Sequence, residues 1–323
     1  MSEPFPLHQL QTLVAIVDAG GFEAAARELG VSAPAVSQRV RALEAAAGRP
    51  LIHRTVPPEL TAPGERLLPY ARRLVALAND ASRAVHGAAE TGLGREQLPL
   101  AVNADSLSTW FIDALGSAPH ASATDFRIER ADQDHTAALL ASGRVLGAVT
   151  ASTEPVAGCV SDVLGSMRYL PLAAPALLAR HGITPDDARQ GAVPRAVAQL
   201  PMVEYDGSDE LQLAALRRWL GTDATPPTHR VPSSWGFARA VEAGLGWGMV
   251  PEEQAKAALE AGALLLIPGA DSVDVVLHWQ RWDGPSTVLP DFSRHLLAFA
   301  GRRLRAAPPV TPSAAPPAKP AGA

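Results

Sequence analysis

The stretch from residue 22 to residue 46, FEAAARELGVSAPAVSQRVRALEAA, constrains the fold more than any other part of the chain. Its first half places apolar side chains three and four positions apart, as one face of a helix requires, at Phe22, Ala25, Ala26 and Leu29. Gly30 then ends this helix, because glycine accepts the left-handed conformation that closes many helices. We therefore predict a short helix followed by a tight turn.

The second half of the same stretch predicts another helix. Ser32 is suited to cap its first turn, and Pro34 falls within that turn, where a missing N–H does no harm. The apolar stripe is Val36, Val40 and Leu43, and the other face carries Ser37, Gln38, Arg39 and Arg41. This is the pattern of a helix-turn-helix, although a packed helix pair without DNA remains open on this pattern alone.

Residues 51–60 predict a small β-wing beside the second helix. The run from Leu51 to Thr55 changes from apolar to basic, and Pro57 and Pro58 then make a stiff turn. A wing in this place would bring Arg54 to a DNA phosphate.

A long helix is expected next, from about Pro63 to Ala89, with Thr61 near its start. Its apolar side chains recur at near-heptad spacing, at Leu67, Leu74, Leu77 or Ala78, Ala81 and Val85. A helix of this kind with no domain beside it usually packs against a partner helix, so we expect a dimer. Gly87, Gly92 and Gly94 mark a hinge to a second domain.

Composition excludes several classes of protein. The chain has no run of about 18 apolar residues and no basic-then-apolar leader, so we expect a cytoplasmic protein without a membrane span. The single Cys159 rules out an internal disulfide framework, and the nine His are scattered without metal-ligand spacing. The net charge of −5 lies beyond residue 90, and residues 22–73 carry eight Arg against five Glu. The basic surface is therefore local, and affinity for non-specific DNA should be modest and sensitive to salt.

From Gln97 onward, short apolar strands alternate with helices, which predicts an α/β domain. The expected strands are 98–102, 126–130, 145–150, 169–173, 202–205, 228–231, 247–250, 264–267 and 273–280. Ligands of such domains bind at the carboxyl ends of the strands. The tail after Arg305 is rich in Pro and Ala and is expected to be disordered.

The segment Asn103 to Ser106 ends the first of these strands and opens a helix. Free N–H groups there can hold a carboxylate, and the carboxylate of Asp105 can form an ion pair with an ammonium group. A second helix start, at Ser233 and Ser234, is expected to face the first. The pair suits an amino acid as ligand, although each serine is also an ordinary helix cap.

A cationic ligand would need a further acid in the opposite lobe or at the hinge. The candidates are Asp132, Asp134, Glu204, Asp206 and Asp209, with Asp206 preferred. Taken singly, each of these acids is more often a solvated surface charge.

The motif AARELGVSAPAVSQRVRALEAAAGRPLIHRT, with LTAPGERLLPYARRL after it, resembles the signature of the LysR-type transcriptional regulators. The resemblance implies a winged helix-turn-helix, a long linker helix that pairs in a dimer, and a two-lobed effector domain like a periplasmic binding protein. The implied domains are 1–60, 61–90 and 95–305, with lobes at about 95–165 plus 268–305 and at 166–267, before a tail at 306–323. It also implies that Ala33, Pro34, Ser37 and Gln38 face the major groove, with Arg41 and Arg54 available to phosphates.

Four further segments narrow the resemblance to the ArgP/LysG subgroup of that family. They are RTVPP at 54–58, LAVNADSLSTW at 100–110, GAV at 147–149 and HWQRW at 278–282. The subgroup implies a homodimer or homotetramer that binds double-stranded DNA with dyad symmetry, meets RNA polymerase and activates an exporter gene. It implies no cofactor, and an effector such as L-lysine, arginine or histidine.

Other classes of function fit less well. The sequence has no G-x-S-x-G elbow, P-loop or H-E-x-x-H, and its glycine run at 244–248 precedes a strand instead of following one, so an enzyme is not expected. A solute-binding protein would not explain the helix-turn-helix. A nucleoid-like or constitutive DNA-binding repressor is the closer alternative, and it predicts no response to amino acids.

Overall fold

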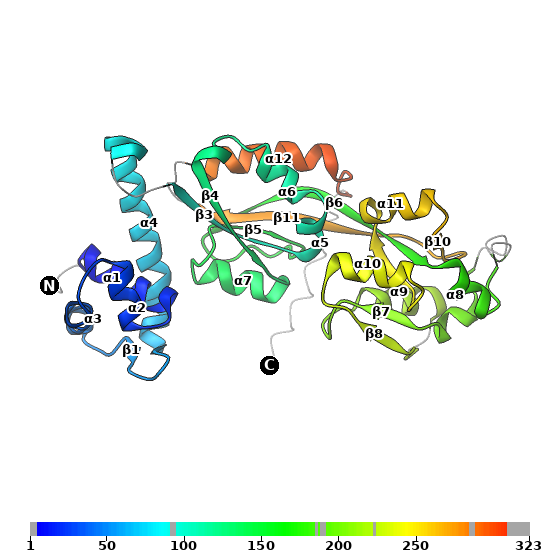
Figure 1. Cartoon of the computed structure of the whole chain (residues 1–323), viewed down its shortest axis with the longest axis horizontal. Helices are drawn as coiled ribbons and strands as arrows, with labels where there is room; N and C mark the ends of the chain where they lie inside the picture. The colour runs from blue at the N-terminus through cyan, green and yellow to red at the C-terminus, as the bar shows by residue number, and fades with distance from the viewer. Residues whose placement is uncertain are drawn as a thin grey trace, which may run out of the picture.

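The computed structural model describes residues 5–90, 95–184, 187, 192–221, 224–283 and 288–308. Figure 1 shows a small helical unit at the N-terminal end, one long helix beside it, and an elongated α/β body with two lobes. This is the predicted fold class. The hinge residues Gly92 and Gly94 and most of the predicted disordered tail lie outside the described residues.

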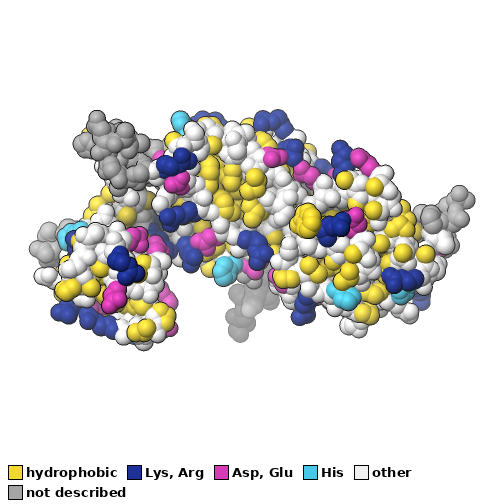
Figure 2. Space-filling model, in the orientation of Figure 1, with side chains coloured by type: hydrophobic (Ala, Val, Ile, Leu, Met, Phe, Trp, Pro, Cys, Tyr) yellow, Lys and Arg dark blue, Asp and Glu magenta, His cyan; other side chains and the backbone are white. Residues whose placement is uncertain are grey.

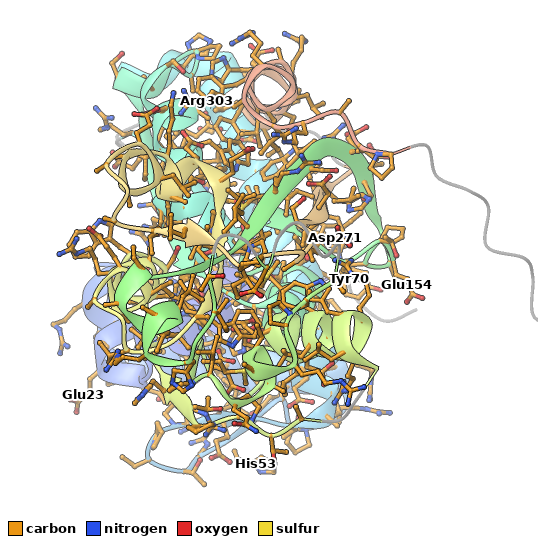
Figure 3. All side chains as sticks on the ribbon, turned by 90° about the vertical axis from the view of Figure 1, so that its right-hand side faces the viewer. Glu23, His53, Tyr70, Glu154, Asp271 and Arg303 are labelled. Carbon is orange, nitrogen blue, oxygen red and sulfur yellow. The ribbon has the colours of Figure 1, made fainter. Side chains whose placement is uncertain are left out.

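The N-terminal unit is the predicted winged helix-turn-helix. Its elements are α1 (Leu7–Ala19), α2 (Phe22–Glu28), α3 (Ala33–Ala47), β1 (Ile52–His53) and β2 (Glu59–Leu60). Gly30 has a φ of 63°, as a turn between α2 and α3 requires, and β1 pairs antiparallel with β2 to form the wing. His53 lies at the edge of the molecule, away from the core (Figure 3).

Helix α4 (Ala62–Glu90) begins directly after the wing. The hydroxyl of Thr61 accepts the N–H of Gly64 at 3.2 Å, which caps the helix. The backbone of Gly64 lies so close to the wing that a Cβ at this position would overlap the carbonyl oxygen of Leu51. Among the described residues, no helix is both long and apolar enough to cross a bilayer.

The lower part of α4 packs on the DNA-binding unit, and its upper part presents apolar side chains to solvent. Leu68 and Ala71 are buried in the N-terminal core. Leu74, Leu77 and Val85 of the predicted near-heptad stripe are exposed, whereas its first member, Leu67, packs against the N-terminal core.

One mixed sheet runs through the α/β body, in the order β10-β6-β11-β5-β3-β4, with β9 also pairing with β6. The first lobe is built on β3 (Glu96–Val102), β4 (Thr124–Arg130) and β5 (Gly147–Thr150), which are mutually parallel where they pair. Its helices are α5 (Ala104–Ser108), α6 (Phe111–Gly116), α7 (Gln133–Ala141) and α12 (Leu289–Arg303).

Side chains alternate across this sheet. Leu98, Leu100 and Val102 of β3 belong to the core that also holds Phe111 of α6 and Phe292 of α12. Ala101, between them, belongs to the core under α7. Helices therefore cover both faces, as the parallel strands require (Figure 1).

The second lobe carries a small sheet of its own, in which β7 (Met202–Glu204) pairs parallel with β8 (Thr228–Arg230). Around it lie α8 (Pro175–Arg180), a 3₁₀ turn (Arg195–Gln199), α9 (Leu211–Leu220), α10 (Ser234–Glu242), β9 (Gly248–Pro251), α11 (Glu252–Glu260) and β10 (Leu265–Leu266). Two long antiparallel strands connect the lobes, β6 (Cys159–Ala173) and β11 (Val273–Trp282).

The strand β6 is much longer than the sequence predicted, since residues 159–168 were not expected to be extended. Its first five residues are half-buried or exposed, and Ser161, Asp162, Gly165 and Ser166 interrupt its apolar residues, so no continuous apolar run reveals it. The predicted lobe boundary at residues 165–166 falls inside this strand, and the domain limits stay predictions.

Candidate functional site

The predicted DNA-reading residues lie along one side of α3. Val36, Val40 and Leu43 are buried on the inner side, and Ser32 caps the helix through its hydroxyl, 3.4 Å from the N–H of Ala35. The outer side carries Pro34, Gln38 and Arg41, which are exposed, and Ser37, which is half-buried, whereas the half-buried Ala33 packs against the N-terminal core. This side of α3 is therefore accessible to base edges if the helix enters the major groove of DNA.

The wing is fixed to the end of α3 by one carboxylate. The carboxylate of Glu44 accepts the N–H of Leu51 at 2.9 Å, which fixes the position of the wing strand before Arg54 relative to α3. Arg54 is exposed. Figure 2 shows Lys and Arg side chains gathered at the lower left of the N-terminal unit, where Figure 1 places α3. Helix and wing together form a positively charged, solvent-facing surface.

A cavity of about 790 Å³ lies between the two lobes. The first lobe lines it with the ends of β3, β4 and β5 and with the first turn of α7, and the second lobe with the segment after β7. Side chains of Tyr169, Phe237, Met249 and Val275 complete the lining. The volume suits a ligand of amino-acid to drug size.

Of the described acids on this lining, Asp105 is the one whose pKa is raised. The hydroxyl of Tyr169 donates to its Oδ2 at 2.6 Å, and Ser234 also hydrogen-bonds to its side chain. Burial raises the pKa of Asp105 above its usual range, and the two hydrogen bonds oppose that rise only partly. A cation placed beside this carboxyl would lower its pKa again and favour the charged form.

Asn103 lies at the end of β3, one position before α5. Its side chain makes no cap hydrogen bond, and its Oδ1 atom is buried without a partner among the described residues. Such an atom is costly unless a ligand or water supplies a donor. Asn103 and Asp105 together offer acceptors for an ammonium group.

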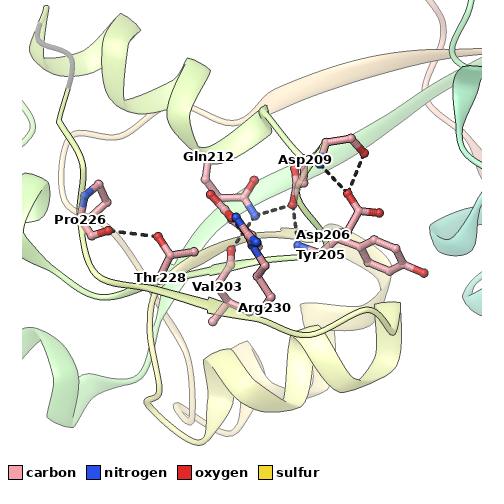
Figure 4. Close-up of polar contacts among 10 residues, drawn as sticks. Val203, Tyr205, Asp206, Asp209, Gln212, Pro226, Thr228 and Arg230 are labelled. Carbon is pink, nitrogen blue, oxygen red and sulfur yellow. Dashed lines mark hydrogen bonds and ion pairs between the residues drawn. The ribbon is translucent and has the colours of Figure 1, made fainter.

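The second lobe contributes a loop of acids after β7 (Figure 4). Asp206 accepts the N–H and the hydroxyl of Ser208, at 2.8 and 2.6 Å, and these bonds lower its pKa. Asp209 accepts the N–H of Tyr205 at 2.8 Å and the amide of Gln212 at 3.0 Å. Both carboxylates are held in place before any ligand arrives.

Arg130 joins the two lobes across the cavity. It stands at the end of β4, and its guanidinium donates to the hydroxyl of Tyr205 at 2.6 Å and to the carbonyl of Pro232 at 3.2 Å. Burial raises the pKa of Tyr205, so this phenol stays protonated. The contact ties the first lobe to the second at the edge of the cavity.

The structure brings four of the predicted effector residues onto the cavity lining, namely Asn103, Asp105, Asp132 and Asp206. Ser106, Ser233 and Ser234 are not part of the lining. Ser106 is fully buried, Ser233 caps α10 through Gly236, and Ser234 accepts the amide of Gln254 at 2.8 Å while it supports Asp105. The side chain of Asp134 is outside the described residues. Of the other candidate acids, Asp209 is on the lining, whereas Glu204 is buried beside Arg230.

The sequence prediction missed Arg130, Tyr169 and Tyr205. Arg130 had a usable signal, because it ends a strand of the same parallel sheet as Asn103. The two tyrosines had none, since their position depends on how the lobes pack. Within the described residues, no three His, Cys, Asp or Glu side chains come together in a way that could hold a metal ion.

Comparison with known families gives two matches that divide the chain. Residues 7–65 match the bacterial regulatory helix-turn-helix protein, lysR family, and residues 91–301 match the LysR substrate binding domain. The first match covers α3 and the wing, and the second covers the cavity.

Individual proteins match over nearly the whole chain. The lysine export transcriptional regulatory protein LysG of Corynebacterium efficiens is 41% identical over 303 residues, which is 93% of this chain and 99% of the relative. The crystal structure of ArgP from Mycobacterium tuberculosis has a TM-score of 0.80 at 35% identity, over 93% and 98% of the two chains. Full-length LysG from Corynebacterium glutamicum, solved with bound effector Arg, has a TM-score of 0.70 at 36% identity, over 93% and 99%.

Proposed function

Because the chain belongs to the LysR family of transcriptional regulators, in its ArgP/LysG subgroup, we propose that a basic amino acid binds between its lobes and controls its action on DNA. The proposed effector is L-lysine, L-arginine or L-histidine. The proposed target is a gene for an exporter of that amino acid, which the regulator activates through contact with RNA polymerase.

The charge on the cavity lining carries this proposal. Among the described residues it includes five carboxylates and one arginine; the carboxylates are Asp105, Asp132, Asp206, Asp209 and Glu210. A neutral amino acid would leave this excess negative charge uncompensated, whereas a ligand with a cationic side chain supplies the opposite charge. The arginine bound to LysG of Corynebacterium glutamicum supports a ligand of this class.

Each end of the amino acid has a partner of suitable chemistry. We assign the α-ammonium to Asn103 and Asp105, the α-carboxylate to Arg130, and the cationic side chain to Asp132 and Asp206. Arg130 would exchange Tyr205 and Pro232 for the carboxylate, so binding would alter the contact that joins the lobes. A ligand acts as a switch only if it binds one arrangement more tightly than the other.

On the DNA side, we propose that two chains pair through the exposed side of α4, at Leu74, Leu77 and Val85. Pairing would bury this apolar stripe and set two α3 helices on a site with dyad symmetry. Ala33, Pro34, Ser37 and Gln38 would face bases, and Arg41 and Arg54 would face phosphates. The same pairing is compatible with a tetramer built through the effector domains.

The test combines calorimetry with DNase footprinting on the region upstream of the chain's own gene, at fixed salt. L-lysine, L-arginine, L-histidine and L-leucine are compared, with L-leucine as the neutral control. We expect binding of a basic amino acid and a footprint that changes in length or bending only with that ligand. A specific footprint that ignores all four would reject the proposed effector class, and a footprint without sequence preference would favour the nucleoid-like alternative.

A further inference from the structure

Helix α7 connects the cavity to the linker helix. Its N-cap Asp132 and the first-turn residues His135 and Thr136 line the cavity. Its other end, at Ser142 and Gly143, lies against α4, where a side chain at Gly143 would come into contact with Pro69 and Arg72. The nine residues of α7 span roughly 13 Å, so one short rigid element reaches both places.

Arg72 is the joint at the far end of α7. One nitrogen of its guanidinium donates to the carbonyl of Ser142 at 3.0 Å, and the other pairs with Asp18 of α1. The carbonyls of the last turn of a helix carry partial negative charge, which favours a cation there. The side chain of Arg72 is only 10% exposed. This one residue of α4 therefore contacts the effector domain and the DNA-binding unit at once.

A second contact links the same two helices. The indole N–H of Trp282 donates to the carbonyl of Leu140, in the last turn of α7, at 3.1 Å. The guanidinium carbon of Arg73 lies 3.2 Å from the centre of a Trp282 ring, a close cation–π stack. Adjacent arginines of α4 thus fasten two carbonyls of α7, one directly and one through Trp282.

The near end of α7 is built to respond to a ligand. The carboxylate of Asp132 accepts the N–H of His135 at 2.9 Å and so caps the helix. The same carboxylate faces the cavity. A cation that binds Asp132 competes with this cap, and the first turn of α7 must then adjust.

We propose that α7 is the element through which the state of the cavity reaches the DNA-binding unit, with Arg72 as the joint that passes it to α1. What fills the cavity rests on the function proposed above, but the mechanical link does not. Arg72 is a positioning residue, since it touches neither the ligand nor DNA. Its removal should uncouple two functions that each persist.

The first experiment needs no ligand. Affinity for a fluorescent operator, selected in vitro with the wild-type chain, is measured by anisotropy for full-length D132A, R72Q and the double variant. We expect D132A to change DNA affinity by about threefold or more in the wild-type background and by less than about 1.5-fold in the R72Q background. D113A is the matched control, because Asp113 is an exposed acid of the same lobe that does not line the cavity, and it should leave affinity unchanged.

Additive effects in this cycle would overturn the link, and so would a D132A variant whose DNA affinity equals that of the wild type. If R72Q does not fold, D18N replaces it in the same cycle. Asp18 is half exposed and carries the far end of the joint, so its loss removes the ion pair with little strain.

The second experiment adds L-arginine and L-lysine. R72Q should bind the active ligand within about threefold of the wild type, and its ligand-dependent change in DNA affinity should fall to less than half. R127Q, which removes an exposed arginine of β4, is the control and should respond fully. A full response in R72Q would reject the joint. A wild type that binds neither amino acid would reject the proposed effectors while the ligand-free cycle still decides the link.

Discussion

The proposed DNA-reading surface and the proposed ligand cavity are built in opposite ways. The first comes from one continuous stretch, residues 33–54, whose outward side chains are largely solvent-exposed. The second gathers short segments from both lobes, and its acids are already bonded to neighbours, as Asp105 is to Tyr169, 64 residues away. A surface of the first kind can be changed residue by residue. In the second kind, each change also disturbs a partner.

The largest expected effect separates the two regions outright. L43A empties a fully buried position of the N-terminal core and should destabilise that unit by about 2–5 kcal/mol. DNA binding should be lost, while calorimetry finds the amino-acid affinity unchanged because the cavity lies in another core. Loss of both activities would show that the two regions unfold together, and the comparison would fail.

D105N comes next and tests the mutual dependence of the cavity groups. It removes the charge that faces the ligand, so affinity for a basic amino acid should fall about 10- to 100-fold, equivalent to about 1.4–2.7 kcal/mol. The variant should nonetheless melt at a higher temperature than the wild type without ligand, because a buried carboxyl with a raised pKa costs stability when ionised. D113N, an exposed acid of the same lobe, should change neither quantity. A lower melting temperature for D105N would contradict this account of the site.

Q38A addresses the other side of the comparison. Gln38 is exposed on α3, so its removal should leave thermal stability within about 0.5 kcal/mol of the wild type. Affinity for the selected operator should fall about tenfold, the value of one good base contact. Affinity for a scrambled duplex should stay the same, and an equal loss on both duplexes would assign Gln38 to the backbone instead.

The smallest effect is a dependence on pH. The folded-state pKa of Asp105 is raised, so its contribution to stability is present at low pH and is lost as pH rises through that pKa. Ligand affinity should move the other way, rising by at most about tenfold per pH unit above about pH 4, because the cation needs the ionised carboxyl. Calorimetry across this window should show proton release on binding. D105N should lose this pH dependence of ligand affinity. An unchanged pH profile in D105N would show that the proton released on binding comes from another group.

The success of prediction from the sequence differs between the same two regions. The helix-turn-helix was predicted nearly to the residue, because Val36, Val40 and Leu43 report a helix through their own spacing. The wing was predicted from its prolines, and the exposed stripe of α4 from its heptad spacing. In each case the physical cause lies within a few residues of its effect.

The cavity could be predicted only in part. Asn103 and Asp105 were found because ligands collect at strand ends, a rule that requires no knowledge of packing. Tyr169 depends on which strands cross between the lobes, and no local pattern encodes that. Arg130 ends a strand beside the one that leads to Asn103, so the same rule could have found it. The cap role of Asp132 was missed, because the start of α7, DQDH, was interpreted as a cluster of acids.

Gly64 sets a rule for anyone who recombines this protein with others to make a biosensor. Its backbone lies so close to the carbonyl of Leu51 that a donor sequence must supply the wing and the start of α4 as a matched pair. A crossover between residues 51 and 64 would join two surfaces that were never fitted to one another. One placed after Val75 keeps that fit, but the sensor half then keeps its two points of attachment only if the incoming DNA reader also has Arg at positions 72 and 73.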